Sequence, residues 1–240
     1  MEWRVERKAE CASTQDEARK LARAGAPEGT VVVAERMTGG RGTEGRPWAA
    51  PAGGLYLSLV LRPPLEASLL TIALGCAVAD TLEIAGAEPK LKWVNDVLVD
   101  GRKCAGVLVE AESTGDKVDF WVCGIGVNVN GQAAKLFPPP LNAQAITLEE
   151  VLGCDSCVPD LEAALLAAVA NRVAQLRRGM GAVVLTDVRA RDALLGKRVT
   201  VRSGNVEQAG TADGIDDRGR LRLQTAGGPR LADVGTVTIH

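Results

Sequence analysis

Two apolar segments joined by Asp100-Gly101 constrain the fold of this 240-residue chain more than any other feature. Asp-Gly favours a tight turn that reverses the chain between antiparallel strands. Residues 91–99 (LKWVNDVLV) precede the turn and KCAGVLVEAES follows it, and both segments are rich in apolar and β-branched residues. The sequence therefore predicts one strand over 91–99 that pairs with an antiparallel return strand.

Further strands and helices are expected on both sides of this hairpin. β-Branched or alternating apolar runs predict strands at 30–35, 55–63 and 119–130. Apolar residues at helical spacing and cap signals predict helices at 13–24, 67–85, 147–153 and 160–178. For the first helix, Thr14 with Glu17 has the spacing of a capping box, and so does Ser13 with Asp16.

The texture changes near residue 194. Five short strands separated by glycine turns follow in under fifty residues. Such a pattern is typical of a small β-barrel-like domain. We therefore expect one large unit followed by a small β unit.

Charge and hydropathy narrow the class of protein. The 28 basic and 30 acidic residues give a net charge of −2, which offers no global attraction to nucleic acid or to an acidic membrane surface. The first ten residues are charged and show no signal peptide. The longest apolar stretch, 69–86, contains Asp80 and Glu83 and is interpreted as a buried helix. We expect a cytoplasmic protein with no membrane partner.

The six cysteines give little evidence for a metal site. Only Cys154 and Cys157 form a CxxC pair, and the single histidine is His240. A tetrahedral zinc site needs about four ligands, so two reduced loop cysteines are the simpler interpretation, with a redox pair as the alternative.

Three segments carry residues suited to binding an anion. The first is GGRGTEGRPW at 39–48, where four glycines allow backbone N–H groups to face a ligand and two arginines supply forked donors. It is not a Walker loop, because GxxxxGK[ST] is absent. On composition alone, a glycine-rich surface loop with solvated arginines explains it equally well.

The second segment is KWVND at 92–96 with RKCAG at 102–106. Asn95 and Asp96 interrupt an apolar run, and burying them unpaired would cost a few kcal/mol. Lys103 follows the turn, where its ammonium could lie over a bound anion. The third segment is GIGVNVN at 124–130, in which strand glycines suggest that another group approaches the backbone closely. Ordinary turn residues and core glycines are the alternatives.

Taken together, the motifs GRGxxGRxW, KWxND with a following lysine and AGxLxE, and GIGxNVN resemble those of the biotin–protein ligases, in that order and spacing. Ser13-Thr14-Gln15 resembles the family's STN segment, and LGKRVTV…GTV resembles its SH3-like C-terminal domain. The resemblance implies an α+β fold: a mixed-sheet catalytic domain of the biotin/lipoate ligase type over 1–187 and a small SH3-like β-barrel domain over 188–240.

The resemblance also implies a two-step reaction. Biotin's carboxylate attacks the α-phosphate of ATP to give biotinyl-5′-AMP, and a lysine of a biotin carboxyl carrier protein or domain then takes the biotinyl group. Magnesium is expected to accompany ATP. The implied catalytic residues are Lys103, Arg41 and Asp96; biotin-binding residues are Ser13, Thr14, Met37, Gly40, Arg41, Lys103, Gly106 and Gly124; ATP- or adenylate-binding residues are Arg41, Thr43, Arg46, Trp48, Asn95, Lys103, Val127 and Asn128.

Three positions depart from the family pattern. Met37 stands where a glutamine is common, Thr43 where an arginine is common, and Val94 where a proline is common. The first two departures predict weaker biotin contacts, a shifted substrate, or easier release of the adenylate.

The motifs begin near residue 11, which leaves no room for the DNA-binding domain of longer family members, so we expect no DNA partner. A homodimer is common in the family. The alternatives to a biotin ligase are a lipoate or octanoate ligase of the same fold and a non-catalytic binding protein.

Overall fold

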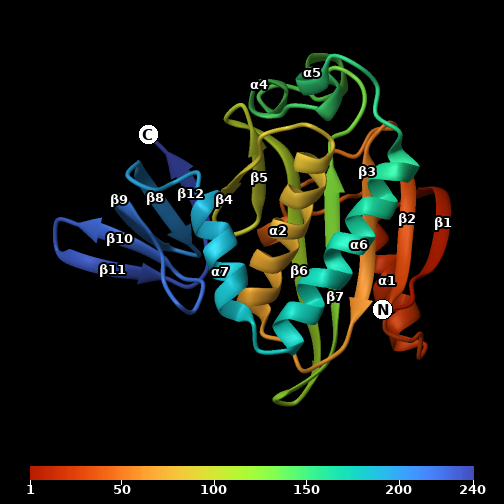
Figure 1. Ribbon diagram of the computed structural model, residues 1–240, viewed down its shortest axis with the longest axis horizontal. Coiled ribbons are helices and arrows are strands. Elements are labelled where there is room, and N and C mark those ends of the chain that lie inside the picture. Colours follow the sequence, from red (N-terminus) through yellow and green to blue (C-terminus); the bar gives the residue numbers. More distant parts are fainter.

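The β-branched and leucine-rich segments form a central sheet in the computed structural model, which describes residues 1–240 (Figure 1). Its strands pair in the order β1-β2-β3-β7-β6-β5-β4. β1 is parallel to β2 and all other neighbours are antiparallel, so the sheet is mixed, as predicted. The strands are β1 (Arg4–Cys11), β2 (Thr30–Met37), β3 (Leu55–Leu61), β4 (Lys90–Lys92), β5 (Asp96–Val99), β6 (Arg102–Thr114) and β7 (Lys117–Val127).

Helices cover both faces of this sheet. In Figure 1, α2 and α6 lie in front of the strands, and α1 lies behind them. Strand alternation explains the division: Val31 and Val33 join the main core with α2 and α6, whereas Val32 packs with α1 in a small separate cluster. The helices are α1 (Thr14–Arg23), α2 (Ala67–Ile84), α3 (Ala133–Leu136), α4 (Leu141–Gln144), α5 (Leu148–Leu152), α6 (Val158–Arg177) and α7 (Gly181–Ala190), with a 3₁₀ turn η1 (Thr43–Gly45).

Helix α2 is apolar around most of its circumference. By length and composition alone it is the one helix that could cross a membrane, and 61% of its residues are buried inside the protein. This burial matches the core helix that the sequence predicts at 67–85.

The second sheet is a five-stranded antiparallel unit, shown in blue in Figure 1. Its order is β11-β10-β9-β8-β12, and it confirms the small β unit expected from the glycine-spaced strands. The strands are β8 (Arg198–Ser203), β9 (Val206–Ile215), β10 (Leu221–Thr225), β11 (Gly228–Ala232) and β12 (Thr236–Ile239). The expected boundary at 187/188 falls inside α7 and stays a prediction.

Hydrogen bonds at the β4 edge of the large sheet join it to the segment between α7 and β8 and to the second unit. The Leu91 N–H donates to the Arg191 carbonyl (2.8 Å), and the Ala193 N–H donates to the Leu91 carbonyl (2.9 Å). Two residues further on, the Trp93 indole N–H donates to the Gly219 carbonyl at 2.9 Å. The β4 end of the sheet is therefore held directly by the second unit.

The single strand predicted over 91–99 is wrong. The chain makes an antiparallel hairpin there, in which β4 pairs with β5 and residues 93–95 form the turn. The turn is stabilised from outside: Trp93 bonds to Gly219, and the Asn95 side-chain amide donates to the Val107 carbonyl at 2.9 Å. These partners are distant in sequence, so the local apolar pattern resembles an uninterrupted strand.

Three further local features differ from the expectations. β1 and α7 are regular elements that the apolar pattern did not predict. The helix expected at 13–24 is present as α1, but Ser13, its N-cap, makes no side-chain capping bond, so the predicted capping box is wrong. The strand predicted to reach residue 130 ends at Val127.

Candidate functional site

A cleft of about 880 Å³ lies between the α1 face of the large sheet and the second unit. Loops and strand ends from both units line it, including residues 41–43, 46–49, 143–145 and 235–239. All the site residues implied by the resemblance line this cleft except Gly40 and Val127. Gly40 packs against Trp48, and the Val127 side chain is buried in the main core.

The charge of the cleft is strongly asymmetric. Its lining contains five cationic side chains, from Arg41, Arg46, Lys92, Arg102 and Lys103, and one carboxylate, Asp96. The protein as a whole carries a net charge of only −2. The positive charge of the cleft is therefore a local arrangement, which would concentrate positive potential around a bound phosphate or carboxylate.

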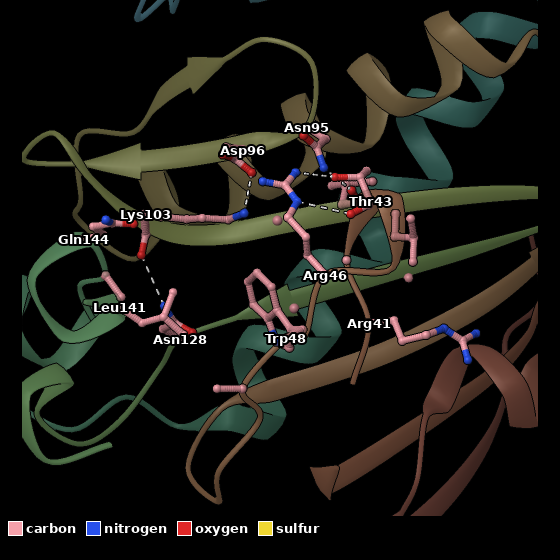
Figure 2. Close-up of a pocket in the computed structure, with 18 of the residues that line it drawn as sticks. Arg41, Thr43, Arg46, Trp48, Asn95, Asp96, Lys103, Asn128, Leu141 and Gln144 are labelled. Carbon is pink, nitrogen blue, oxygen red and sulfur yellow. Dashed lines mark hydrogen bonds and ion pairs between the residues drawn. The ribbon is translucent and has the colours of Figure 1, made fainter. Parts of the chain in front are cut away.

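Lys103 lies near the middle of the cleft (Figure 2). Its ammonium is 2.5 Å from the Asp96 carboxylate and 5.1 Å from the centre of the Trp48 ring. Asn128 fixes the main chain here, because its side-chain amide donates to the carbonyls of Lys103 (3.2 Å) and Ile146 (3.3 Å). Asn128 thus supports Lys103 from behind, a contact that the sequence could not show.

Trp48 rests on a floor made of two glycines. Gly106 of β6 and Gly126 of β7 are directly opposite each other in the sheet. A Cβ at Gly126 would lie 2.7 Å from the Trp48 ring, and one at Gly106 would lie 3.1 Å from it. Gly126 confirms the close approach that the sequence predicts for the strand glycines of GIGVNVN, and the approaching group is the Trp48 indole. The buried Trp48 ring N–H has no partner within the protein.

The β4–β5 hairpin contributes a second ammonium, that of Lys92, which is not among the site residues that the resemblance implies. Its Nζ is 3.8 Å from Asp96. Burial lowers the pKa of Lys92; Lys103 and Arg46 lower it further, and Asp96 opposes them. The signal was available, since Lys92 stands in the KWVND motif beside Asn95 and Asp96.

The glycine–arginine loop (residues 39–48) contacts the second unit. The Arg46 guanidinium donates to the hydroxyls of Thr43 and Thr236, each at 2.9 Å. The Thr236 hydroxyl in turn donates to Glu44 at 3.3 Å. Glu44 has φ 58°, a backbone conformation that is rare for residues other than glycine. Contacts from outside the turn, such as the one from Thr236, therefore help to hold it. Strand β12 therefore helps to order the loop.

Arg41 points away from Lys103 in Figure 2. Its guanidinium forms a bidentate pair with Asp16 at 2.8 and 2.6 Å. This hydrogen-bonded pairing lowers the pKa of the Asp16 carboxyl. A direct role for the Arg41 side chain at phosphate would require it to leave Asp16, and that role stays a prediction.

The closed end of the cleft is lined by small polar groups and one thioether. Thr14, Gln15, Met37 and Ser58 meet here. Met37 accepts hydrogen bonds through its sulfur from the Thr14 N–H (3.4 Å) and hydroxyl (3.5 Å). Ser58 was not among the predicted site residues, although a serine within the buried run LYLSLVL was a usable signal.

Comparison with known proteins identifies the family. Residues 10–128 match the biotin/lipoate A/B protein ligase family, and residues 194–238 match the biotin protein ligase C-terminal domain. The chain is 36% identical to a biotin–[acetyl-CoA-carboxylase] ligase of Paracoccus denitrificans, over 94% of this chain and 96% of that protein.

Other relatives are longer, and solved structures share the fold. The chain is 42% identical to the bifunctional ligase/repressor BirA of Bacillus spizizenii, over 59% of this chain, and the match spans only 45% of that relative. A biotin protein ligase from Aquifex aeolicus, solved with biotin and ATP, superposes with a TM-score of 0.87 at 28% identity and covers 98% of each chain. The chain belongs to the biotin/lipoate A/B protein ligase family and carries that family's biotin protein ligase C-terminal domain.

Proposed function

We propose that this protein is an ATP-dependent biotin–protein ligase, which forms biotinyl-5′-AMP and transfers biotin to a lysine of a carboxyl carrier protein. The observation that carries the proposal is the position of Lys103, whose ammonium faces Asp96 and Trp48 in a cleft lined by five cations. The Paracoccus relative and the Aquifex complex with biotin and ATP support this activity over lipoate ligation or binding without catalysis.

The first step must bring two anions together. A carboxylate oxygen of biotin attacks the α-phosphorus of ATP, a new P–O bond forms, and the bond to the β-phosphate oxygen breaks to release pyrophosphate. Lys103 is suited to neutralise both the carboxylate and the α-phosphate. Lys92 and Arg46 are suited to the outer phosphates, where fixed positive charge stabilises the leaving group.

The adenine ring and the metal have candidate partners as well. Trp48 offers a flat face and a free ring N–H, and Asn128 and Asn95 border the same space. No group of three His, Cys, Asp or Glu side chains could hold a metal alone. The donor set therefore suits magnesium that arrives with ATP, keeps several waters and uses Asp96 as its one carboxylate; such an ion would neutralise phosphate charge.

The second step transfers the acyl group to the carrier. The carrier's lysine nitrogen attacks the acyl carbon of biotinyl-5′-AMP, an amide forms and AMP leaves. The incoming lysine must be neutral, and Asp96 is the one cleft carboxylate that could accept its proton. The reaction and its substrates suit a cytoplasmic enzyme that acts on a carrier protein and not on DNA. We also propose a domain boundary at 187/188. We further propose a homodimer, which light scattering would test.

One assay tests the function. The protein is incubated with ATP, magnesium, a biotin carrier domain and either biotin or lipoate, and the carrier's mass is measured. A biotin adduct is expected; a lipoyl adduct alone, or no adduct with either acid, would overturn the proposal. Lys103→Ala should slow adenylate formation by at least a hundredfold, about 3 kcal/mol of barrier. Lys117→Ala, an exposed lysine at the β6–β7 turn, is the matched control and should keep wild-type activity.

Thr43 leads to a second, separable expectation. Its hydroxyl only accepts from Arg46, whereas an arginine at this position could reach a phosphate itself. We expect the adenylate to dissociate faster from this protein than from relatives with arginine there. Thr43→Arg should slow release of biotinyl-5′-AMP in a chase experiment. Equal rates of adenylate release from the wild-type protein and from Thr43→Arg would contradict this expectation.

A further inference from the structure

A chain of buried hydrogen bonds runs behind the closed end of the cleft. It links Glu110 to Gln15, Gln15 to Ser58, and Ser58 to the Thr14 hydroxyl. Ser58 is fully buried, and Gln15 and Thr14 are 4% and 3% exposed. In so dry a site, each donor must meet an acceptor, so the direction of every hydrogen bond can be worked out.

The Gln15 amide can adopt only one orientation. Its nitrogen lies 3.0 Å from the Glu110 carboxylate, 3.0 Å from the Val122 carbonyl and 3.5 Å from the Leu108 carbonyl. All three groups accept hydrogen bonds, so the amide NH₂ must face them. The amide oxygen therefore faces Ser58, 3.0 Å away.

Gly124 makes room for this arrangement. A Cβ at Gly124 would lie 2.7 Å from the Gln15 amide oxygen and 3.4 Å from the Ser58 hydroxyl. No side chain can occupy that position without moving Gln15. The glycine that the sequence places in GIGVNVN therefore serves the hydrogen-bond chain on one side, as Gly126 serves Trp48.

The direction of the remaining bonds follows from the Gln15 orientation. An amide oxygen cannot donate, so the Ser58 hydroxyl must give its only proton to Gln15. The Ser58 oxygen is then the acceptor for the Thr14 hydroxyl at 2.9 Å. The other partner of that hydroxyl, the Met37 sulfur at 3.5 Å, is also an acceptor. The Thr14 proton is thus held within the protein, and only lone pairs remain for the cleft.

We propose that Gln15 and Ser58 are positioning residues that keep the Thr14 hydroxyl as a hydrogen-bond acceptor, so that the cleft selects an acid whose ring carries an N–H donor. This inference rests on the proposed function, because the cyclic urea of biotin supplies such an N–H. A ring that presents an oxygen at the same place would meet lone pairs with lone pairs. Buried polar groups left unpaired in this way give strong discrimination.

The test measures discrimination and not activity alone. Biotin is compared with its two cyclic-carbamate analogues, in each of which one ring N–H is replaced by oxygen. Kd values are measured calorimetrically without ATP, so binding is read independently of catalysis. The wild-type protein should bind at least one analogue about tenfold or more weakly than biotin, consistent with one unpaired buried acceptor.

Two variants release the Thr14 proton by different routes. Ser58→Ala removes the oxygen that accepts the Thr14 proton. Gln15→Met removes the amide oxygen that accepts the Ser58 proton, with little change in side-chain length, so that Ser58 can donate to Thr14 instead of accepting from it. Each should reduce the biotin-to-carbamate discrimination at least fivefold, because the freed hydroxyl can turn and donate. KM for biotin should rise severalfold, while kcat for adenylate formation stays within about twofold, since the carboxylate end is untouched.

A merely structural role would give a different pattern. It would weaken the binding of biotin and of its analogues equally and leave the ratio of their Kd values unchanged. The control Thr81→Val deletes a buried hydroxyl bonded within α2, and it should likewise leave that ratio unchanged. Unchanged discrimination in both cleft variants would overturn the inference while wild-type biotinylation stands. Equal binding of biotin and both carbamates by the wild-type protein would overturn it without any variant. Failure of the wild-type protein to bind biotin would reject the proposed function as well.

Discussion

Gly126→Ala should disturb the nucleotide half of the cleft through Trp48. The added Cβ would lie 2.7, 2.8 and 2.9 Å from three indole atoms. Ordinary contacts between such atoms are about 3.5–4.0 Å. The ring would therefore have to recede by roughly 0.8 Å or tilt, because the new methyl group projects from the middle of a seven-stranded sheet and cannot yield.

The expected cost has two parts. Overpacking of this kind costs about 1–3 kcal/mol of stability. Displacement of Trp48 should also raise KM for ATP about tenfold, and KM for biotin less, because the three nearest contacts of the new methyl group are all with Trp48, whereas Gln15 and Ser58 border Gly124. Thermal unfolding measures the first effect, and ATP-dependent pyrophosphate exchange at saturating biotin measures the second.

Gly75→Ala is the matched control. A Cβ there would meet only Leu91, at an ordinary 3.7 Å, and alanine favours the helix that contains it. The control should keep its KM for ATP and unfold at the same temperature or higher. Combining Gly126→Ala with Trp48→Ala should add little to the ATP defect of Trp48→Ala alone. Full additivity, or a wild-type KM for ATP in Gly126→Ala, would refute the proposed role of the glycine floor.

Three shorter predictions concern the junction of the two units. Lys92→Met should stabilise the ligand-free protein by about 1 kcal/mol at pH 7, because burial lowers the Lys92 pKa and penalises its charge, while weakening ATP binding. The Lys92 pKa is lowered in the folded state, so the variant's advantage in free energy of unfolding, measured by chemical denaturation, should disappear as the pH rises through about 10. Trp93→Phe should cost about 1–3 kcal/mol in chemical denaturation by leaving the buried Gly219 carbonyl unpaired. Thr236→Val should raise KM for ATP severalfold by releasing Arg46, and unchanged kinetics would count against the link between β12 and the loop.

The sequence predicted elements whose stability is local and missed those that depend on distant partners. The strands at 30–35 and 55–63 and the helix at 67–85 have apolar patterns that match their burial. β1 is charged and largely exposed, and only its parallel pairing with β2 makes it a strand. The turn inside 91–99 depends on Gly219 and Val107, which no local pattern reveals.

The candidate site shows the same division. The structure brings together Lys103, Asp96 and Trp48, three residues from separate motifs that resemble those of the biotin–protein ligases. The pairing of Arg41 with Asp16, and the contribution of Thr236 from another sheet, depend on side-chain geometry and unit packing. Ser58 was visible as a polar residue in an apolar strand, but its meaning depends on Gln15, which lies 43 residues away in sequence.

Two groups of side chains that come from different elements line the cleft. Thr14, Met37 and Ser58 come from α1, β2 and β3, whereas Lys92, Asp96 and Thr236 come from the β4–β5 hairpin and the second unit. Changes that do not share contacts combine almost independently. The end that recognises the acid should therefore be open to redesign for other carboxylic acids while nucleotide activation is retained, which makes this scaffold a suitable starting point for attaching new chemical labels to a carrier lysine.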